Sequence, residues 1–375
     1  MENRGNQKHI GIFGQSNVGK STLFNLLLDQ DYSIVSQERG TTTDPVYKAM
    51  EVPGLGPCLF IDTAGLFDQT NLEKDRMKRS LKVIEECDLC LVVVQEGMIS
   101  WDFIEDLHRK KKKILLVQNG PLSKESKAQI KEDLLPFNKD LILKKLADEL
   151  GDVKEVGLLD GLVKKGDRLL LVMPQDIQAP KGRLILPQVM TLRACLDMGC
   201  LALCCKPENL DQVLKDDGKD LDLVITDSQI FKEVKKALPQ GLPLTSFSIL
   251  MARYKGDIKS YVAGAHKLDQ LDENAKILIS EACTHAPMEE DIGRVKIPRL
   301  LRKKLGQKIK IDFVRGLDFP DNVKDYDLVI SCGSCMFNRQ RTLARIDQVK
   351  AQGVAISNYG IIIAKLKGIL EEIRY

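Results

Sequence analysis

Two groups of residues in this chain have the types and the spacing that chemistry requires. Residues 14–21 read Gly-Gln-Ser-Asn-Val-Gly-Lys-Ser, which fits the pattern G-x-x-x-x-G-K-[ST] completely. Far downstream, Cys283-Thr284-His285 and Cys332-Gly333-Ser334-Cys335 combine thiol and imidazole side chains. The first group predicts that a nucleoside triphosphate is bound, and the second predicts a metal centre with thiolate ligands. Few classes of protein need both.

Each position of the nucleotide motif has a chemical role. Gly14 and Gly19 let the backbone curl so that its N–H groups surround the phosphates. Lys20 brings a positive charge to the β- and γ-phosphates, and Ser21 brings its hydroxyl to Mg²⁺. The motif follows a predicted strand and opens a predicted helix, which is the context in which it binds nucleotides. The predicted nucleotide-binding residues are Gly14, Asn17, Val18, Gly19, Lys20, Ser21, Thr22 and Asn119.

Two further segments follow the motif in the order that a nucleotide switch requires. In the segment 40–44, Gly-Thr-Thr-Thr-Asp, Thr42 is expected to bring a second hydroxyl to Mg²⁺. Asp62 ends an apolar strand and can reach the water shell of the metal, while the Gly65 N–H can meet the γ-phosphate. Either segment alone reads as an ordinary turn, but their order after the motif favours the functional interpretation. The predicted catalytic residues are Lys20, Thr42, Asp62 and Gly65.

The downstream cysteine pair lies between an apolar run and a helical pattern. Cys332 and Cys335 come after the predicted strand Leu328–Ser331, and a helix is expected from Asn338. Two thiolates on a tight turn can bind one iron or one zinc ion. The spacing alone fits a redox-active dithiol as well as a metal site.

Cys283 favours the metal site because it also follows a predicted strand, Lys276–Ser280. The carboxyl ends of parallel strands meet at one edge of a sheet, so these thiols are expected to converge. Three thiolates, from Cys283, Cys332 and Cys335, suit a 4Fe-4S cluster whose fourth iron is left for another ligand. Three sulfurs together with His285 would also suit structural Zn²⁺.

Composition narrows the class of protein. The chain has 375 residues, of which 43% are hydrophobic and 29% are charged, as in a soluble globular protein of two or three domains. A net charge of +3 gives no argument for a nucleic-acid partner. No apolar stretch is long enough to span a bilayer, and the polar start Met1–Lys8 does not read as a secretory signal. We therefore expect a cytoplasmic protein without nucleic-acid or membrane partners.

In that compartment the ten cysteines are expected to be thiols or metal ligands rather than disulfides. Seven of them fall inside apolar patterns and are expected to be small buried side chains. These seven are Cys58, Cys87, Cys90, Cys195, Cys200, Cys204 and Cys205.

Apolar runs alternate with amphipathic helical patterns along the whole chain, which predicts an α/β fold with parallel sheets covered on both faces. The predicted strands are His9–Phe13, Cys58–Ile61, Leu89–Val94, Ile114–Gln118, Leu169–Met173, Cys200–Cys204, Leu223–Thr226, Leu242–Thr245, Lys276–Ser280, Lys308–Val314 and Leu328–Ser331. The predicted helices include one that opens at Lys20, and Leu72–Glu86, Asp257–Leu271 and Asn338–Gln352. A Gly- and charge-rich stretch near residues 151–166 marks a domain junction.

The nucleotide segments resemble translation-factor-like GTPases of the Era and TrmE type. In that group an asparagine at the position of Asn17 is associated with a K⁺ ion, and Leu66 stands where Ras-like proteins have a glutamine. The resemblance therefore implies GTP, Mg²⁺ and K⁺ as ligands. The guanine-reading motif N-K-x-D departs from the family, because residues 119–122 read Asn-Gly-Pro-Leu. Guanine selection is implied by the resemblance and not by these residues.

Longer segments resemble the iron-iron hydrogenase maturation GTPases, the HydF family, over essentially the full chain. These segments are residues 179–188, 223–229, 244–256, 281–299 and 332–339. The resemblance implies a P-loop GTPase domain over residues 1–155, followed by two smaller parallel-sheet α/β domains. Of these, residues 166–255 would form a dimerisation domain, and residues 256–375 an iron-sulfur cluster-binding domain.

Membership also implies a function. It implies a homodimeric scaffold that receives a di-iron precursor from two radical-SAM maturases and delivers it to the hydrogenase apoprotein. By the same resemblance Cys283, Cys332 and Cys335 match the ligands of a 4Fe-4S cluster, and His285 matches the histidine of the family's C-x-H. Ser331 stands where the family usually has a histidine directly before C-x-x-C.

Two other readings stay open. One is a nucleotide-independent iron-sulfur carrier whose GTPase domain is degenerate. The other is an Era-like GTPase with a structural zinc, although a charge near neutrality and the lack of a recognisable RNA-binding module argue against it.

Overall fold

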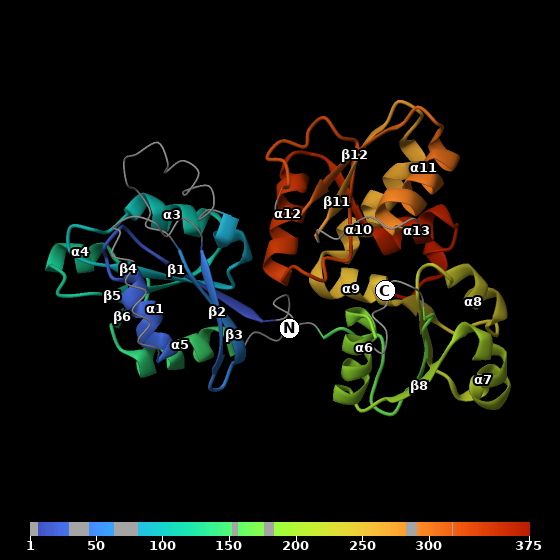
Figure 1. The fold of residues 1–375 in the computed structure, drawn as a ribbon, viewed down its shortest axis with the longest axis horizontal. Helices are drawn as coiled ribbons and strands as arrows, with labels where there is room; N and C mark the ends of the chain where they lie inside the picture. Colours follow the sequence, from blue (N-terminus) through green and yellow to red (C-terminus); the bar gives the residue numbers. More distant parts are fainter. Residues whose placement is uncertain are drawn as a thin grey trace. The chain divides into compact units, whose positions relative to one another are not determined.

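The computed structural model of the 375-residue chain describes residues 7–29, 45–63, 82–151, 157–175, 184–282, 291–316 and 318–375. The chain divides into two compact units, Met1–Glu155 and Val156–Tyr375 (Figure 1). The first unit contains one sheet, and the second contains two. Strands and helices alternate in both units, so the predicted α/β fold class is confirmed.

The sheet of the first unit has six strands in the order β2-β3-β1-β4-β5-β6. Its strands are β1 (Lys8–Phe13), β2 (Val46–Val52), β3 (Gly56–Asp62), β4 (Leu89–Val94), β5 (Lys113–Gln118) and β6 (Leu134–Pro136). All neighbours pair in parallel except β2, which runs antiparallel to β3. The expectation of a wholly parallel sheet is therefore wrong at this edge. Only residues 53–55 connect β2 to β3, and so short a link permits only an antiparallel pair.

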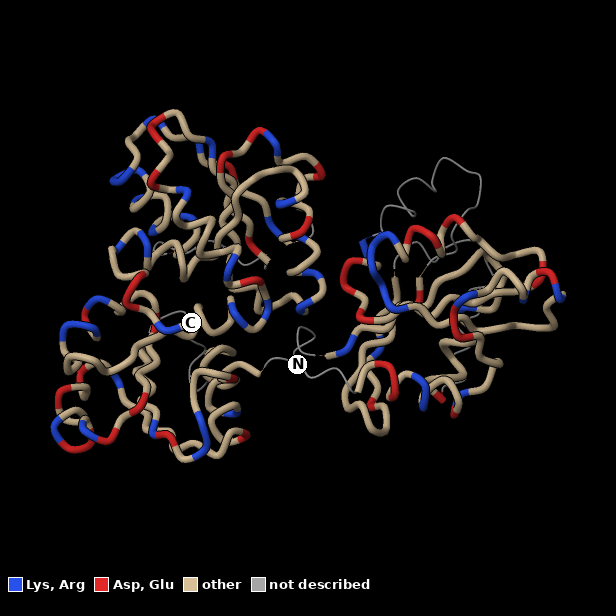
Figure 2. The backbone as a smooth tube through the Cα atoms, turned by 180° about the vertical axis from the view of Figure 1, so that it is seen from behind, with Lys and Arg blue, Asp and Glu red and all other residues tan. Residues whose placement is uncertain are grey.

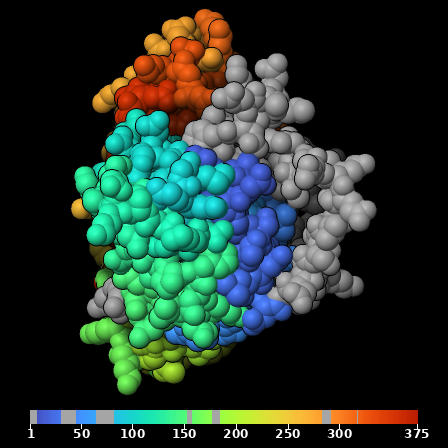
Figure 3. All heavy atoms as spheres, turned by 90° about the vertical axis from the view of Figure 1, so that its left-hand side faces the viewer, coloured from blue at the N-terminus to red at the C-terminus, as the bar shows by residue number. Residues whose placement is uncertain are grey.

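Helices cover both faces of this sheet. The helices of the first unit include α1 (Lys20–Leu28), α3 (Trp101–Arg109), α4 (Lys124–Gln129) and α5 (Lys139–Gly151), of which α4 buries no residue. Leu23 of α1 and Ile142 of α5 pack with Ile10 of β1 on one face. On the other face Phe103 of α3 packs with Phe13. Figure 3 shows α1 and α5 side by side at the surface of this unit.

The second unit contains two four-stranded parallel sheets, ordered β10-β9-β7-β8 and β12-β11-β13-β14. The strands of the first are β7 (Arg168–Val172), β8 (Leu201–Cys205), β9 (Leu223–Thr226) and β10 (Leu244–Ser246). The strands of the second are β11 (Lys276–Glu281), β12 (Lys310–Arg315), β13 (Leu328–Ser331) and β14 (Ala355–Asn358). The sequence did not predict β14, because four residues that include two polar ones make a weak apolar run.

The main helices of this unit are α6 (Leu186–Asp197), α7 (Leu210–Asp217), α8 (Phe231–Ala237), α9 (Phe247–Lys255), α10 (Ile258–His266), α11 (Ile297–Leu305), α12 (Arg339–Ala351) and α13 (Tyr359–Leu366). Buried side chains of both sheets, such as Val224 and Ile279, belong to one apolar cluster. Helix α9 contacts α6, α10, α12 and α13. The end of α9 is therefore fixed from several sides.

Two sequence expectations need correction or restriction. Cys204 is exposed and Cys205 is only half-buried, because both lie on β8, the last strand of its sheet in the described part of the chain. Of the predicted helix Leu72–Glu86, only residues 82–86 are described, and these are helical.

No helix among the described residues has the length and apolar character needed to cross a membrane. Acidic and basic residues are interspersed along both units (Figure 2).

Candidate functional site

The loop between β1 and α1 has the backbone geometry of a phosphate cradle. Gly14, Asn17 and Gly19 have φ values of 146°, 62° and 100°, which favour glycine or asparagine. A Cβ atom at Gly14 would lie 2.7 Å from the carbonyl oxygen of Val93. A Cβ atom at Gly19 would lie 2.5 Å from Nδ2 of Asn119. Both glycines are therefore required by space as well as by backbone angle.

The start of α1 is prepared for an anion. Its N-cap residue is Gly19, which provides no side-chain cap, and the first turn carries no acidic residue. The N–H groups of this turn thus face no competing carboxylate of the helix itself. A phosphate group fits this position because it accepts hydrogen bonds from the helix N-terminus and is favoured by the helix dipole.

Lys20, Ser21 and Asp62 lie together beside this loop. Lys20 is 7% exposed, and its ammonium group donates to the carbonyl oxygen of Gln15 over 2.7 Å. The Ser21 hydroxyl donates to Oδ2 of Asp62 over 2.9 Å. Burial raises the pKa of the Asp62 carboxyl above its usual value, and the Ser21 hydroxyl and the Lys20 charge oppose this shift.

The second carboxylate oxygen of Asp62 supports a magnesium site. Oδ1 is buried and has no hydrogen-bond partner among the described residues. Buried polar atoms are nearly always paired, and a hydroxyl next to a carboxylate is a donor set that Mg²⁺ with its waters suits. Ser21 and Asp62 therefore fit the ion. The predicted Thr42 and Gly65 lie outside the described residues.

The side chain of Asn119 stabilises the phosphate loop through a hydrogen bond. Its side-chain amide donates to the carbonyl oxygen of Val18 over 2.9 Å, and its backbone N–H donates to Val94 over 2.8 Å. The position at which the family has an aspartate is occupied by Leu122, which is 8% exposed and packs in the apolar core. The carboxylate that accepts hydrogen bonds from guanine in the family is thus replaced here by the buried side chain of Leu122.

The cysteine pair lies at the carboxyl end of β13, beside the end of β11. These two strands pair in parallel, with Ser331 opposite Ser280, so the predicted meeting of the two strand ends is confirmed. The Cys332 N–H donates to the carbonyl oxygen of Ser280 over 2.9 Å. In return the Ala282 N–H donates to the sulfur of Cys332 over 3.0 Å.

The other predicted ligands cannot be placed from the described residues. Cys283 and His285 lie in the segment 283–290, outside them. Among the residues that are described, no group of three or more His, Cys, Asp or Glu side chains could hold a metal ion. Cys332 and Cys335 are both half-buried.

Backbone carbonyls of the cysteine turn are tied by side chains from other elements. Nδ2 of Asn358, at the end of β14, donates to the carbonyl oxygen of Cys332 over 3.0 Å. Nζ of Lys255 donates to the carbonyl oxygens of Phe337, over 2.6 Å, and Cys335, over 3.4 Å. Burial lowers the pKa of Lys255 to about 8, while a negative charge on Cys335 raises it.

Two buried guanidinium groups flank the same turn. Arg345 and Arg341 of α12 are 9% and 7% exposed, and they lie over the Phe337 ring at 4.5 and 5.5 Å. Arg345 also donates to the Ser280 hydroxyl over 3.3 Å. Buried cations next to this turn lower the cost of burying negative charge on it. The turn with Cys332 and Cys335 is therefore suited to an anionic ligand set, whose third predicted thiol, Cys283, lies outside the described residues.

The end of β11 carries a structural ion pair. Glu281 is 4% exposed, and its Oε2 accepts from Arg294 over 2.9 Å and from Arg315 over 3.2 Å. Arg294 also lies over the Phe313 ring at 4.8 Å. Both positive charges are thus engaged by this carboxylate directly before the Ala282–Cys283 peptide.

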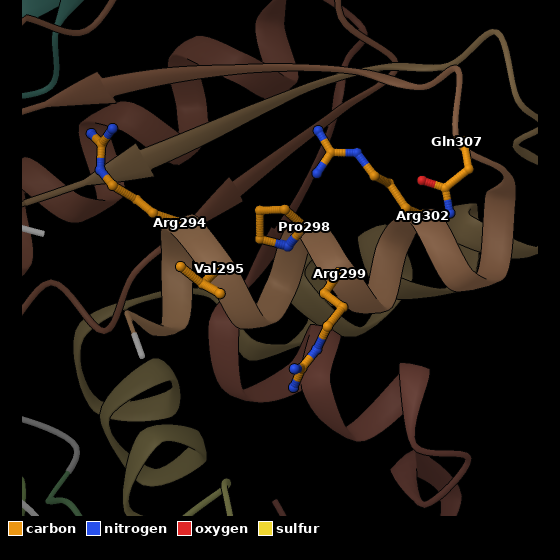
Figure 4. Close-up of a pocket in the computed structure, with 6 residues that line it drawn as sticks. All are labelled: Arg294, Val295, Pro298, Arg299, Arg302 and Gln307. Carbon is orange, nitrogen blue, oxygen red and sulfur yellow. The ribbon is translucent and has the colours of Figure 1, made fainter. Parts of the chain in front are cut away.

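A separate surface groove of about 310 Å³ runs along α11 and the π-helical turn Ile292–Lys296. It is lined by Arg294, Val295, Pro298, Arg299, Arg302 and Gln307 (Figure 4). Arg294 is held by Glu281, and Arg299 extends to the opposite side of the helix from Arg302. The guanidinium groups do not converge on one point, so the groove is not a second phosphate site.

The sequence interpretation missed Lys255, Asn358, Arg341 and Arg345. Lys255 follows an apolar helical pattern, and the helix dipole alone explains a lysine at such an end. Asn358 ends a strand that was not predicted. The available signal was weak in each case, because the contacts join residues far apart in the sequence.

Three family models match the chain. The hydrogen maturase F dimerization domain matches residues 158–256, and the hydrogen maturase F tetramerization domain matches residues 259–373. The 50S ribosome-binding GTPase model matches residues 9–120. A GTPase domain of this kind implies GTP and Mg²⁺ as ligands, and the two oligomerisation domains support self-association.

Curated relatives resemble the first unit. GTPase Der of Wolinella succinogenes is 40% identical over 97 residues, which is 25% of this chain and 20% of that protein. tRNA modification GTPase MnmE of Streptococcus thermophilus is 35% identical over 132 residues, 34% of this chain and 29% of that protein. The chain thus spans about a fifth to a third of the length of these relatives.

A crystal structure of Aquifex aeolicus Era bound to GDP·AlF4− aligns with 61% of this chain and 97% of that chain, at 19% identity and a TM-score of 0.32. The two hydrogen maturase F models together span more than half of the 375 residues, and both matches lie after the GTPase match in the chain. The chain belongs to the hydrogen maturase F family, HydF.

Proposed function

We propose that this chain is a GTP-hydrolysing scaffold that carries a 4Fe-4S cluster and assembles or delivers the di-iron subcluster of iron-iron hydrogenase. The observation that carries the proposal is the hydrogen bond of 3.0 Å from the Ala282 N–H to the Cys332 sulfur. Ala282 directly precedes Cys283 in the sequence. This adjacency supports a ligand set that combines Cys283 with Cys332 and Cys335.

The proposal assigns a role to each part of the chain. Residues 1–155 form the GTPase domain, residues 166–255 a dimerisation domain and residues 256–375 the cluster-binding domain. The chain acts as a homodimer in the cytoplasm. Its partners are two radical-SAM maturases, which supply the di-iron precursor, and the hydrogenase apoprotein, which receives it.

In the GTPase domain, the site residues bind the triphosphate and stabilise the charge that develops during transfer. The Lys20 ammonium exchanges the Gln15 carbonyl for phosphate oxygens, and the N–H groups at the start of α1 surround the phosphates. Water attacks the γ-phosphorus, the bond to the β–γ bridging oxygen breaks, and GDP and phosphate leave. Ser21 and Thr42 would hold Mg²⁺, Asp62 would bind its waters, and the ion would neutralise charge on the phosphates.

Asn17, Thr42 and Gly65 would complete the nucleotide site. Asn17 would hold K⁺, which would supply positive charge where other GTPases use an arginine. We expect Thr42 and Gly65 to contact the γ-phosphate side of the site, so that their loops reorder when phosphate leaves. Hydrolysis is then a switch that alters contacts with partners, and not the chemistry of cluster assembly.

In the cluster domain, Cys283, Cys332 and Cys335 would hold the 4Fe-4S cluster. When bound, the cluster would supply an iron open to exchange, for which His285 is the candidate protein ligand. Asn358 fixes the carbonyl of Cys332, and the buried cations near Phe337 offset the negative charge of the thiolates.

Anaerobic reconstitution with iron and sulfide tests the cluster assignment. The wild-type chain should bind about four irons and show a 4Fe-4S paramagnetic resonance spectrum after reduction. The Cys332→Ser variant should lose most of this iron, because one thiolate ligand is removed. The matched control is Cys204→Ser, since Cys204 is an exposed thiol on β8 and should leave the cluster unchanged. A Cys332→Ser chain that keeps the full spectrum would refute the assignment.

The burial of Leu122 at the guanine-reading position favours one alternative, a nucleotide-independent iron-sulfur carrier with a degenerate GTPase domain. Measuring the hydrolysis of GTP, ATP and XTP with and without K⁺ distinguishes this carrier from the proposed GTP-hydrolysing scaffold. GTP turnover that K⁺ stimulates supports the proposed switch. Full cluster loading without any turnover supports the carrier, and zinc in place of iron would support an Era-like GTPase with a structural zinc.

A further inference from the structure

Lys255, the last residue of α9, is buried in an unusual way. Only 1% of it is exposed, whereas lysine is rarely so buried without specific partners. Its Nζ donates to the carbonyl oxygen of Phe337 over 2.6 Å and to that of Cys335 over 3.4 Å. Burying an ammonium group is costly, so its placement on one turn calls for a reason.

The turn that Lys255 contacts contains Cys332 and Cys335, the two predicted cluster ligands that lie within the described residues. Ser334 has a φ of 52°, in the left-handed region that non-glycine residues adopt only when the surroundings hold them there. Asn358 holds the Cys332 carbonyl and Lys255 holds the Cys335 carbonyl, over 3.0 and 3.4 Å. Side chains of β14 and α9 therefore fix the two ends of the C-x-x-C segment.

The charge of Lys255 also has a consequence for a cluster on this turn. A 4Fe-4S cluster with three thiolate ligands is anionic, and one-electron reduction adds a further negative charge. A buried positive charge stabilises the reduced form more than the oxidised form, because the interaction grows with the charge and is poorly screened.

We propose that Lys255 is a positioning residue of the cluster site, which fixes the backbone around Cys335 and favours the reduced state of the bound cluster. This inference rests on the proposed function. Lys255 lies in the segment that matches the dimerization model, whereas Cys335 and Phe337 lie in the segment that matches the tetramerization model. The contact thus joins the two family domains at the cluster turn.

The test compares reconstituted full-length chains. Lys255→Met removes the charge and both hydrogen bonds at similar volume. Lys255→Gln removes the charge and keeps an N–H donor on a side chain one atom shorter, and Lys255→Arg keeps the charge and the donors. The matched control is Lys367→Met, because Lys367 is a half-buried lysine that donates to the Ser228 and Gln229 carbonyls after β9, away from the cysteine turn. Two quantities are measured: iron and sulfide retained after anaerobic desalting, and the midpoint potential from dithionite titration followed by paramagnetic resonance.

We expect Lys255→Met to retain less than half of the wild-type iron. Its remaining cluster should show at least a tenfold lower ratio of reduced to oxidised form at a fixed potential, which is about 59 mV for one electron. Lys255→Arg and Lys367→Met should behave as the wild type. A Lys255→Met chain with wild-type retention and potential overturns the role of Lys255 and leaves the proposed function intact.

Failure of the proposed function can be distinguished from failure of the role of Lys255. A wild-type chain that takes up no cluster refutes the proposed function itself. If circular dichroism shows that Lys255→Met does not fold, the role of Lys255 is tested by comparing Lys255→Gln with Lys255→Arg. A more negative potential in Lys255→Gln than in Lys255→Arg supports the role, and equal potentials overturn it.

Discussion

Among single residues, Gly19 of the phosphate loop lies against Asn119, which directly follows β5. Its φ is 100°, and a Cβ atom would lie 2.5 Å from Nδ2 of Asn119. A Gly19→Ala chain must strain the backbone and displace Asn119 from the Val18 carbonyl. We expect the first unit to lose about 2 kcal/mol of stability and the nucleotide affinity to fall at least tenfold. Thermal unfolding and titration with a fluorescent GTP analogue measure the two effects.

Gly97→Ala is the matched control for this prediction. Gly97 has a φ of 70°, but nothing lies within 4 Å of the Cβ position, so the substitution adds backbone strain without a clash. It should cost about 1 kcal/mol and leave nucleotide affinity unchanged. Equal nucleotide affinity in Gly19→Ala and Gly97→Ala would show that contact with Asn119 does not shape the phosphate loop.

The residues of the phosphate loop could be predicted because their spacing is local. Lys20 and Ser21 stand in one short motif, and Asp62 ends an apolar strand that a P-loop sheet places next to β1. The base-reading position could also be seen to depart from the family. That Leu122 is a core residue could not, because its burial depends on packing with α3 and neighbouring strands.

Lys255 shows the limit of such prediction for single residues. Its ammonium group donates to the carbonyl oxygen of Phe337, which lies 82 positions further along the chain. Nothing in the pattern of α9 distinguishes a lysine that ends in solvent from one that ends in the cysteine turn. Only the packing of α9 against α12 and α13 does so.

Among the elements, β8 and α6 present the clearest surface for self-association. Leu201 of β8 is 59% exposed, and Leu196 and Val189 of α6 are 72% and 47% exposed. In the described part of the chain β8 is also the last strand of its sheet, so its outer backbone groups can pair with another strand. We expect Leu201→Lys to weaken self-association by about 2 kcal/mol, or roughly thirtyfold in its dissociation constant. Sedimentation velocity at several protein concentrations measures this change.

The control for the Leu201→Lys prediction lies in the other unit. Leu141 of α5 is 49% exposed, so Leu141→Lys adds the same charge and removes a similar apolar surface. It should leave self-association unchanged. Equal sedimentation of Leu201→Lys and the wild type would exclude β8 from the interface.

Most elements could be predicted because buried parallel strands have continuous apolar runs. The predicted limits of Leu89–Val94, Leu223–Thr226 and Leu328–Ser331 agree with β4, β9 and β13. The three strands that were missed, β2, β6 and β14, lack such runs. β2 lies at an edge and buries only Val52, while β6 and β14 have only three and four residues.

In the whole molecule, the distribution of buried apolar side chains could not be predicted from pattern. The apolar runs give no sign that the second and third sheets share a cluster, because either sheet could bury its faces under its own helices. The structure joins Leu170 and Val224 of one sheet with Ile279 and Ile330 of the other. The second unit should therefore unfold as one cooperative body.

Each of the four apolar clusters formed by the described residues draws its members from one unit alone. This predicts two unfolding transitions for the chain in calorimetry, since each unit has its own core. A ligand stabilises only the unit that binds it, by about 2.7 kcal/mol at a hundredfold excess over its dissociation constant. GTP with Mg²⁺ should then raise the midpoint of one transition, and cluster reconstitution that of the other. Lys20→Ala should abolish the first shift and preserve the second, whereas a single transition raised by both treatments would contradict independent units.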